Sequence, residues 1–270
     1  MYQLVELAPD VSVWLADRPD HGRPNSGVVI DGDGSVTVID AQPAPSAAAA
    51  LSRALEPKRV RRLVVTSSHV EYVGGSREFT MAGVYGSATA SLNLDLPPNR
   101  AGYARLLPEF AAEYDELETR AVSHAVTDPA WLGQTAVAVP TRGQQADNLV
   151  VQVPGTDIVF AGALCAFGVT PIAFDGDPAA WAEALDAMSD LGRIVVPGHG
   201  PVGGLDEVVA LQAYLWACVE AAGDPSAIPA GPWDGWVGRR WDAVNVERAA
   251  RLAAGDDSPP PSMLRALGLA

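Results

Sequence analysis

The stretch VVTSSHVEYVGGSREF, residues 64–79, decides the fold of this chain. An apolar segment at residues 63–65 predicts the end of a buried strand, and a polar loop follows at residues 67–72. The glycine pair at 74–75 then turns the chain into a predicted helix over residues 76–81. A strand, a polar loop and a helix in this order present side chains at the carboxyl end of the strand, where chemistry is commonly placed. We therefore expect a functional site here.

Patterns of apolar residues predict strands and helices along the whole chain. Strands are predicted at residues 3–7, 11–16, 26–30, 35–39, 60–66, 84–85, 135–139, 149–153, 158–161 and 194–196. Helices are predicted at residues 43–55, 76–81, 88–92, 103–120, 178–191, 205–222 and 244–254. The DGDG turn at 31–34 joins two of the strands into a hairpin, and Ser46 is a candidate helix cap. This order indicates an α/β protein with mixed sheets.

The loop resembles the signature loop of the metallo-β-lactamase superfamily, which reads T-H-x-H-x-D-H-x-G-G. Thr66, His69 and the glycine pair at 74–75 match this pattern. Two later stretches also match: VFAGALC at 159–165 resembles the family's F-x-G-D segment, and VVPGHGPVGG at 195–204 resembles its final histidine loop. The resemblance covers about residues 10–220. It implies a four-layer αββα sandwich, in which two mixed β-sheets are flanked by helices and the site lies along one edge between them.

The domain organisation that we expect is one sandwich domain followed by an extension. The domain spans residues 1–222 and carries a helical insertion at about residues 97–120, which follows the linker-like LDLPPNR segment. The extension, residues 223–270, is expected to pack on the domain. Its helix around Asn245 and Arg248 resembles the carboxyl-terminal helix of small-molecule hydrolases in this group.

Composition limits the partners and the compartment. The net charge is −15 and the pI is near 4.5, and 18 Lys and Arg residues are too few for a basic nucleic-acid-binding surface. The first ten residues lack the pattern of a signal peptide, and the longest apolar run, 158–169, is too short to span a membrane. Cys165 and Cys218 do not form a disulfide framework. We therefore expect a cytoplasmic protein whose partner is a small-molecule substrate.

The metal-binding chemistry of the family is largely missing from this sequence. The resemblance implies two metal ions that activate a bridging water. At the family's ligand positions the chain has Ser67, His69, Glu71, Tyr72, Gln144, Ala163 and His199. Two histidines remain, one aspartate is replaced by a longer carboxylate, and four ligands are lost. We therefore expect no metal cofactor, although a single divalent ion held by His69, Glu71 and His199 stays open as an alternative.

The replacements are polar and suggest acid–base chemistry without metal. We expect His69, Glu71, Tyr72 and His199 to be catalytic, because a histidine paired with a carboxylate is a general base and a phenol donates to an oxyanion. The expected substrate-binding residues are Ser67, Gln144, Asn148, Trp233 and Trp236. The function expected from this set is a metal-independent enzyme of small-molecule metabolism, including secondary and polyketide metabolism. It would catalyse cyclisation, isomerisation, elimination or acyl hydrolysis.

Several alternatives remain open from the sequence. The chain is alternatively a non-catalytic protein that binds a ligand or partner, or a mono-metal thioester or lactone hydrolase. A serine nucleophile at Ser67 or Ser68 lacks the G-x-S-x-G elbow. Cys165 is expected to be a buried packing thiol, and His21 and His124 to be ordinary surface residues. A homodimer contact through residues 97–120 or through the tryptophan segment is also open.

Overall fold

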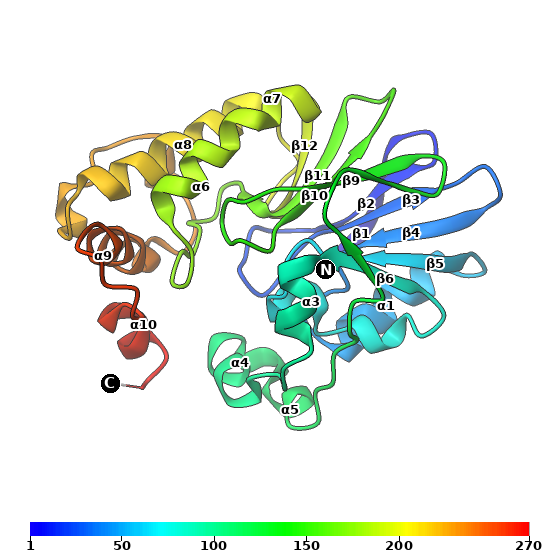
Figure 1. Cartoon of the computed structure of the whole chain (residues 1–270), viewed down its shortest axis with the longest axis horizontal. Helices are drawn as coiled ribbons and strands as arrows, with labels where there is room; N and C mark the ends of the chain where they lie inside the picture. Colours follow the sequence, from blue (N-terminus) through cyan, green and yellow to red (C-terminus); the bar gives the residue numbers. More distant parts are fainter. Residues whose placement is uncertain (270) are drawn as a thin grey trace.

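Two β-sheets lie face to face in the computed structural model, which describes residues 1–269 (Figure 1). The first sheet contains, in spatial order, β1 (Tyr2–Ala8), β2 (Val11–Ala16), β3 (Ser26–Ile30), β4 (Ser35–Ile39), β5 (Arg59–Val64), β6 (Gly83–Ser87) and β7 (His124–Val126). The second contains β12 (Ile194–His199), β11 (Ile158–Ala166), β10 (Leu149–Val153), β9 (Ala136–Pro140) and β8 (Ala130–Leu132). Both sheets are mixed, because β4 to β7 and the pair β11–β12 run parallel while the other neighbours are antiparallel.

The core between the sheets is built from alternate residues of facing strands. Val13 and Ile39 of the first sheet belong to the same buried cluster as Leu149, Val151 and Phe160 of the second. Side chains alternate across a strand, so one face of each sheet supplies this inner layer. The outward faces then need a cover of their own.

Helices supply that cover on both sides. On the first sheet, α1 (Pro45–Leu55) buries Leu51 and Leu55 against the outer face. On the second sheet, α6 (Pro178–Ala184), α7 (Met188–Leu191) and α8 (Leu205–Glu220) form the outer layer (Figure 1). The αββα architecture implied by the resemblance is therefore confirmed.

Several predicted helices are shorter or shifted. The polar loop contains a helical turn, α2 (Val70–Val73), and only the 3₁₀ turn η1 (Ser76–Glu78) follows the glycine pair. Ser46 does not cap α1, because the cap position is Ala44 and the Ser46 hydroxyl donates to Glu113 instead. Residues 178–191 are divided into α6, η3 (Leu185–Ala187) and α7. The helix predicted for 88–92 is present as α3 (Ala88–Leu94).

The insertion is three short helices rather than one. They are α4 (Arg100–Leu106), η2 (Pro108–Phe110) and α5 (Ala111–Tyr114). Pro108 has no backbone N–H and clashes with a preceding helical turn, and Leu107 accordingly leaves the helical conformation with φ −125° and ψ 71°. This break directs Leu106 and Leu107 toward the interior of the molecule.

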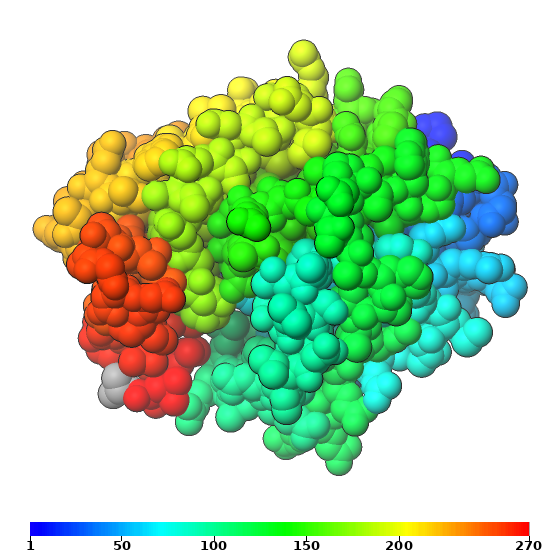
Figure 2. Space-filling model, in the orientation of Figure 1, coloured from blue at the N-terminus to red at the C-terminus, as the bar shows by residue number. Residues whose placement is uncertain are grey.

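The extension after α8 packs against both the second sheet's helices and the insertion. It contains η4 (Pro225–Ala227), η5 (Pro232–Gly235), η6 (Arg239–Trp241), α9 (Asp242–Ala253) and α10 (Pro261–Ala266). Trp241 and Met263 form a buried cluster that also contacts Leu106 of the insertion. Figure 2 shows these two segments meeting at the surface, the extension in red and the insertion in green. The boundary at residue 222 stays a prediction.

Within residues 1–269, every helix is too short or too polar to cross a lipid bilayer.

Candidate functional site

The loop after β5 is fixed at its start by Thr66. The Thr66 backbone N–H and hydroxyl each donate to the buried Asp40 carboxylate at 2.8 Å. The two hydrogen bonds lower the pKa of Asp40, but burial raises it by more, and the resulting pKa is about 8. The Thr66 hydroxyl also accepts from the Ala163 N–H of β11, at 3.2 Å. Thr66 therefore connects the two sheets at the point where the loop begins.

The glycine pair allows the far end of the loop to pack closely. A Cβ on Gly74 would lie 1.9 Å from the Pro43 carbonyl oxygen, and one on Gly75 would lie 2.4 Å from that of Ala41. Gly75 N–H donates to the Gln42 carbonyl oxygen at 2.9 Å. Only glycine fits at such distances, so the pair presses α2 onto the segment that enters α1.

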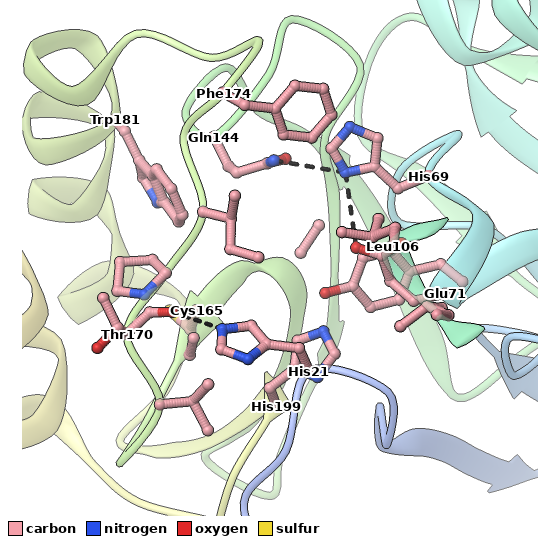
Figure 3. Close-up of a pocket in the computed structure, with 17 residues that line it drawn as sticks. His21, His69, Glu71, Leu106, Gln144, Cys165, Thr170, Phe174, Trp181 and His199 are labelled. Carbon is pink, nitrogen blue, oxygen red and sulfur yellow. Dashed lines mark hydrogen bonds and ion pairs between the residues drawn. The ribbon is translucent and has the colours of Figure 1, made fainter. Parts of the chain in front are cut away.

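A cavity opens at this edge between the two sheets. It occupies about 590 Å³ when its mouth is included. Its polar lining is His21, His69, Glu71, Tyr72, Gln144, Thr170 and His199. Its apolar walls include Leu106, Leu107, Cys165, Ile172, Phe174 and Trp181. Figure 3 shows His69 and Phe174 on one side of the hollow and His21 and His199 on another. The structure thus brings four predicted catalytic residues and Gln144 to one cavity.

His69 is held between two carboxylates. Its Nε2 donates to Asp175 Oδ2 at 3.1 Å, and its Nδ1 lies 3.8 Å from Glu71 Oε1 and 3.4 Å from Gln144 Nε2. Phe174 stacks on the ring, with centroids 5.8 Å apart. Burial alone would lower the pKa of His69, but Asp175 and then Glu71 outweigh burial and raise it to about 10. His69 is therefore a cation at neutral pH.

Glu71 and Tyr72 present an acid–base group and a hydrogen-bond donor. Burial raises the pKa of Glu71, and the neighbouring positive charge on His69 opposes that rise. Burial, together with the negative charges of Glu71 and Asp40, raises the pKa of Tyr72 well above its ordinary value, so the phenol stays protonated. Among the described residues the Tyr72 hydroxyl has no hydrogen-bond partner. It is thus free to donate to a bound molecule.

The two remaining histidines of the cavity are neutral. His199 Nδ1 lies 3.0 Å from the Asp20 carbonyl oxygen, and His21 Nε2 lies 2.8 Å from that of Thr170. A carbonyl oxygen only accepts, so these nitrogens carry the protons and the opposite ring nitrogens are acceptors. Burial lowers the pKa of both rings, and that of His199 falls to about 3, with the nearby His21 contributing.

Two residues that the sequence did not assign to the site are therefore part of it. His21 is not an ordinary surface residue, because Thr170 and Trp241 enclose it beside His199. Asp175 binds His69 although 106 residues separate them in the chain. Neither residue lies in a motif, and only the tertiary contact identifies them. His124, in contrast, is exposed on β7 as expected.

Ser67 and Asn148 do not line the cavity but form hydrogen bonds with residues that do, His69 and Gln144. Ser67 is fully buried, and its hydroxyl accepts from the His69 backbone N–H at 3.3 Å. Asn148 is also fully buried, and its side chain accepts from the Gln145 N–H at 2.8 Å and donates to Gln144. Neither residue lines the cavity. The hydroxyl of Ser68 donates to Asp147 rather than to a histidine.

The structure corrects the expectation that Trp233 and Trp236 wall this pocket. Trp233 is buried in the core, where its indole N–H donates to the Pro229 carbonyl oxygen at 2.9 Å. Trp236 packs against Tyr214 and lines a separate surface hollow next to α8. Both side chains attach the extension to the body through apolar packing, so neither reaches the cavity. Cys165, in contrast, is buried at the cavity as a free thiol, and burial raises its pKa.

The side chains at the family's ligand positions do not fit a pair of metal ions. Ala163 presents a methyl group where a bridging carboxylate would be needed, and Ser67 does not reach the cavity. Tyr72 is a poor ligand because its phenol keeps its proton. Within residues 1–269, no three His, Cys, Asp or Glu side chains are arranged to hold an ion. The donor set therefore differs in kind from a two-metal site.

Comparisons with known proteins agree with this fold. The model of the metallo-beta-lactamase superfamily matches residues 20–199. The metallo-beta-lactamase type 2 of Bacteroides fragilis is 32% identical over 90 residues, which are 31% of this chain and only 36% of that protein. The crystal structure of VMB-1 aligns with a TM-score of 0.63 and 18% identity over 80% of this chain and 97% of its own. A metallo-β-lactamase from Hirschia baltica aligns with a TM-score of 0.61 and 17% identity, over 79% of this chain and 97% of its own.

Proposed function

This chain belongs to the metallo-β-lactamase superfamily, and we propose that it is an enzyme of small-molecule metabolism that works by proton transfer rather than through two metal ions. One observation carries the proposal: His69, Glu71, Tyr72 and His199 line a single cavity. If the former metal-ligand positions had changed without selection for a function, we would not expect an imidazolium, a carboxyl, a phenol and a neutral imidazole to line the same cavity. Such convergent polar groups in an apolar pocket are typical of an active site.

The geometry suggests a role for each group. Glu71 is the proton acceptor or donor, because burial moves its pKa toward neutral pH. Tyr72 donates its free hydroxyl to an oxygen that gains negative charge in the reaction. His69, kept cationic by Asp175, stabilises the same charge from the other side. The unprotonated Nε2 of His199 accepts a hydrogen bond from the substrate.

The walls of the cavity indicate the substrate class. The lining is divided into polar groups, which lie on two sides of the hollow, and apolar side chains, which include Leu107, Ile172 and Phe174 (Figure 3). A molecule with a carbonyl group and an apolar body suits this division. Thioesters, lactones and polyketide intermediates of secondary metabolism are such molecules, and cyclisation, isomerisation, elimination or acyl hydrolysis of them needs only proton transfer. The names of the relatives, metallo-β-lactamases, favour acyl hydrolysis among these.

Turnover of a panel of thioesters, lactones and ceftazidime, measured with and without EDTA, tests the proposal. We expect turnover that EDTA leaves unchanged, that Glu71→Gln lowers by about 10²- to 10⁴-fold, and that Tyr72→Phe lowers by about 10²- to 10³-fold. His124→Gln, on exposed β7, is the control variant and should retain full activity.

Three outcomes would contradict it. Activity that EDTA abolishes would favour the mono-metal hydrolase. A panel compound that raises the melting temperature but is never turned over would favour a ligand-binding protein. Equal activity of the wild type, Glu71→Gln and Tyr72→Phe would mean that these side chains take no part.

A further inference from the structure

The carboxyl-terminal helix α9 holds the loop that forms one wall of the cavity. Asn245 Oδ1 accepts from the Ala173 N–H at 2.8 Å, and its Nδ2 donates to the Pro171 carbonyl oxygen at 2.7 Å. One turn later on the helix, Arg248 Nε donates to the Gly176 carbonyl oxygen at 2.8 Å. Two side chains of one helix thus bind the backbone at both ends of residues 171–176.

The same loop carries two of the side chains that contact the His69 ring. Phe174 stacks on it, and the Asp175 carboxylate accepts its Nε2–H at 3.1 Å. Both lie between the two points at which α9 binds the loop. The Asp175 side chain is 35% exposed, and besides the His69 ring its carboxylate contacts the Gln145 side-chain amide, which donates a hydrogen bond to it.

Burial indicates that these polar residues serve more than packing. Asn245 is fully buried, and its amide also donates to the Tyr214 hydroxyl at 3.0 Å. Arg248 is 5% exposed, and its guanidinium also pairs with Asp257 at 2.7 Å. An apolar side chain would pack α9 without the cost of burying an amide or a guanidinium. Polar groups that are fully hydrogen-bonded instead define one conformation of the segment they bind.

We propose that Asn245 and Arg248 are positioning residues, which hold residues 171–176 so that the Asp175 carboxylate meets the His69 ring. The inference rests on the proposed function only in taking His69 as part of the working site. It gives the extension a role in the chemistry, because the apolar side chains of the loop, Ile172 and Phe174, also pack on the extension, against Trp241, Val244 and Met263.

The hydrogen bond between His69 and Asp175 offers a direct spectroscopic test. Proton–nitrogen spectra of the full-length protein should contain a His69 Nε2–H signal, which Asp175→Asn identifies by shifting or removing it. We expect Asn245→Leu and Arg248→Met to remove or broaden this signal, while Arg248→Lys, which still has a donor for Gly176, keeps part of it. The indole N–H of Trp181, which donates to the Leu164 carbonyl oxygen at 2.8 Å beside the same cavity, should stay unchanged as the internal control.

Arg251→Gln is the matched control variant. Arg251 lies on the same helix but binds Asp256, so its loss should leave the His69 signal intact. An unchanged His69 signal in folded Asn245→Leu and Arg248→Met, or in Arg248→Met alone if the other does not fold, would overturn the proposal. A signal that is absent from the wild type would also overturn it. If the signal is lost while turnover stays at the wild-type level, the positioning role stands and the proposed function fails.

Discussion

His69 differs from an ordinary core histidine in the balance of its surroundings. Burial alone favours the neutral ring, as at His199, where the pKa falls to about 3. At His69 the carboxylates of Asp175 and Glu71 reverse this preference, and the pKa rises to about 10. His69 and His199, the two histidines that remain at the family's ligand positions, therefore carry different charges in one cavity.

Asp175→Asn should change the pH dependence of stability. The pKa of His69 is raised from about 6.5 in the unfolded chain to about 10 in the folded protein. The charged pair therefore stabilises the fold fully below about pH 6.5, and this contribution is lost as the pH rises toward 10. We expect Asp175→Asn to lower the free energy of unfolding at pH 6.5, and the difference from wild type to shrink steadily toward pH 10.

Urea unfolding at several pH values measures this difference. Asp95→Asn, an exposed position at the end of α3, is the control and should show a small difference at every pH. A difference for Asp175→Asn that grows between pH 6.5 and pH 10 would contradict the assignment of His69 as the charged partner.

At the scale of the elements, the position of the loop depends on backbone contacts. Gly74→Ala should destabilise the protein by about 1–3 kcal/mol, because its Cβ would lie 1.9 Å from the Pro43 carbonyl oxygen. The cost comes from this close approach and not from backbone strain, since Gly74 has ordinary helical angles of −57° and −34°. Gly32→Ala in the β3–β4 turn has no atom within 4 Å of its new Cβ and should change stability little. Equal stabilities of the two variants in urea unfolding would contradict the argument.

The elements that the sequence predicts well are those set by local pattern. The β3–β4 hairpin and the strands β2 and β10 have the predicted bounds, because alternation and turn residues specify them. Helices were less well predicted where tertiary packing interrupts them. The insertion is one amphipathic segment by its apolar spacing, yet Pro108 divides it. The short edge strands β7 and β8 have too few residues to form a pattern.

At the scale of the whole molecule, the framework of the site and its chemistry depend on different atoms. Asp40, Thr66 and the Ala163 N–H connect the two sheets, and Gly162, with φ 48°, leaves room for Thr66 at a distance that no Cβ would allow. None of these contacts involves the side chain of Ala163. Residues at metal-ligand positions can therefore change while the sheets, the loop and the cavity keep their arrangement.

This separation also explains how far the site could be predicted. His69, Glu71, Tyr72 and His199 follow from motif positions, because the fold carries those positions to one edge. Asp175 could not be predicted, because its place depends on how the extension binds its loop. No local pattern encodes a contact between segments so far apart in the chain.

Metal content measures the central claim most directly. The protein, purified without chelators and then dialysed, should be analysed for zinc, iron and manganese by mass spectrometry of the elements. Because the donor set does not fit two ions, we expect well below one equivalent of all three metals per chain, and a melting temperature that EDTA does not change. Two tightly held equivalents per chain would contradict the account.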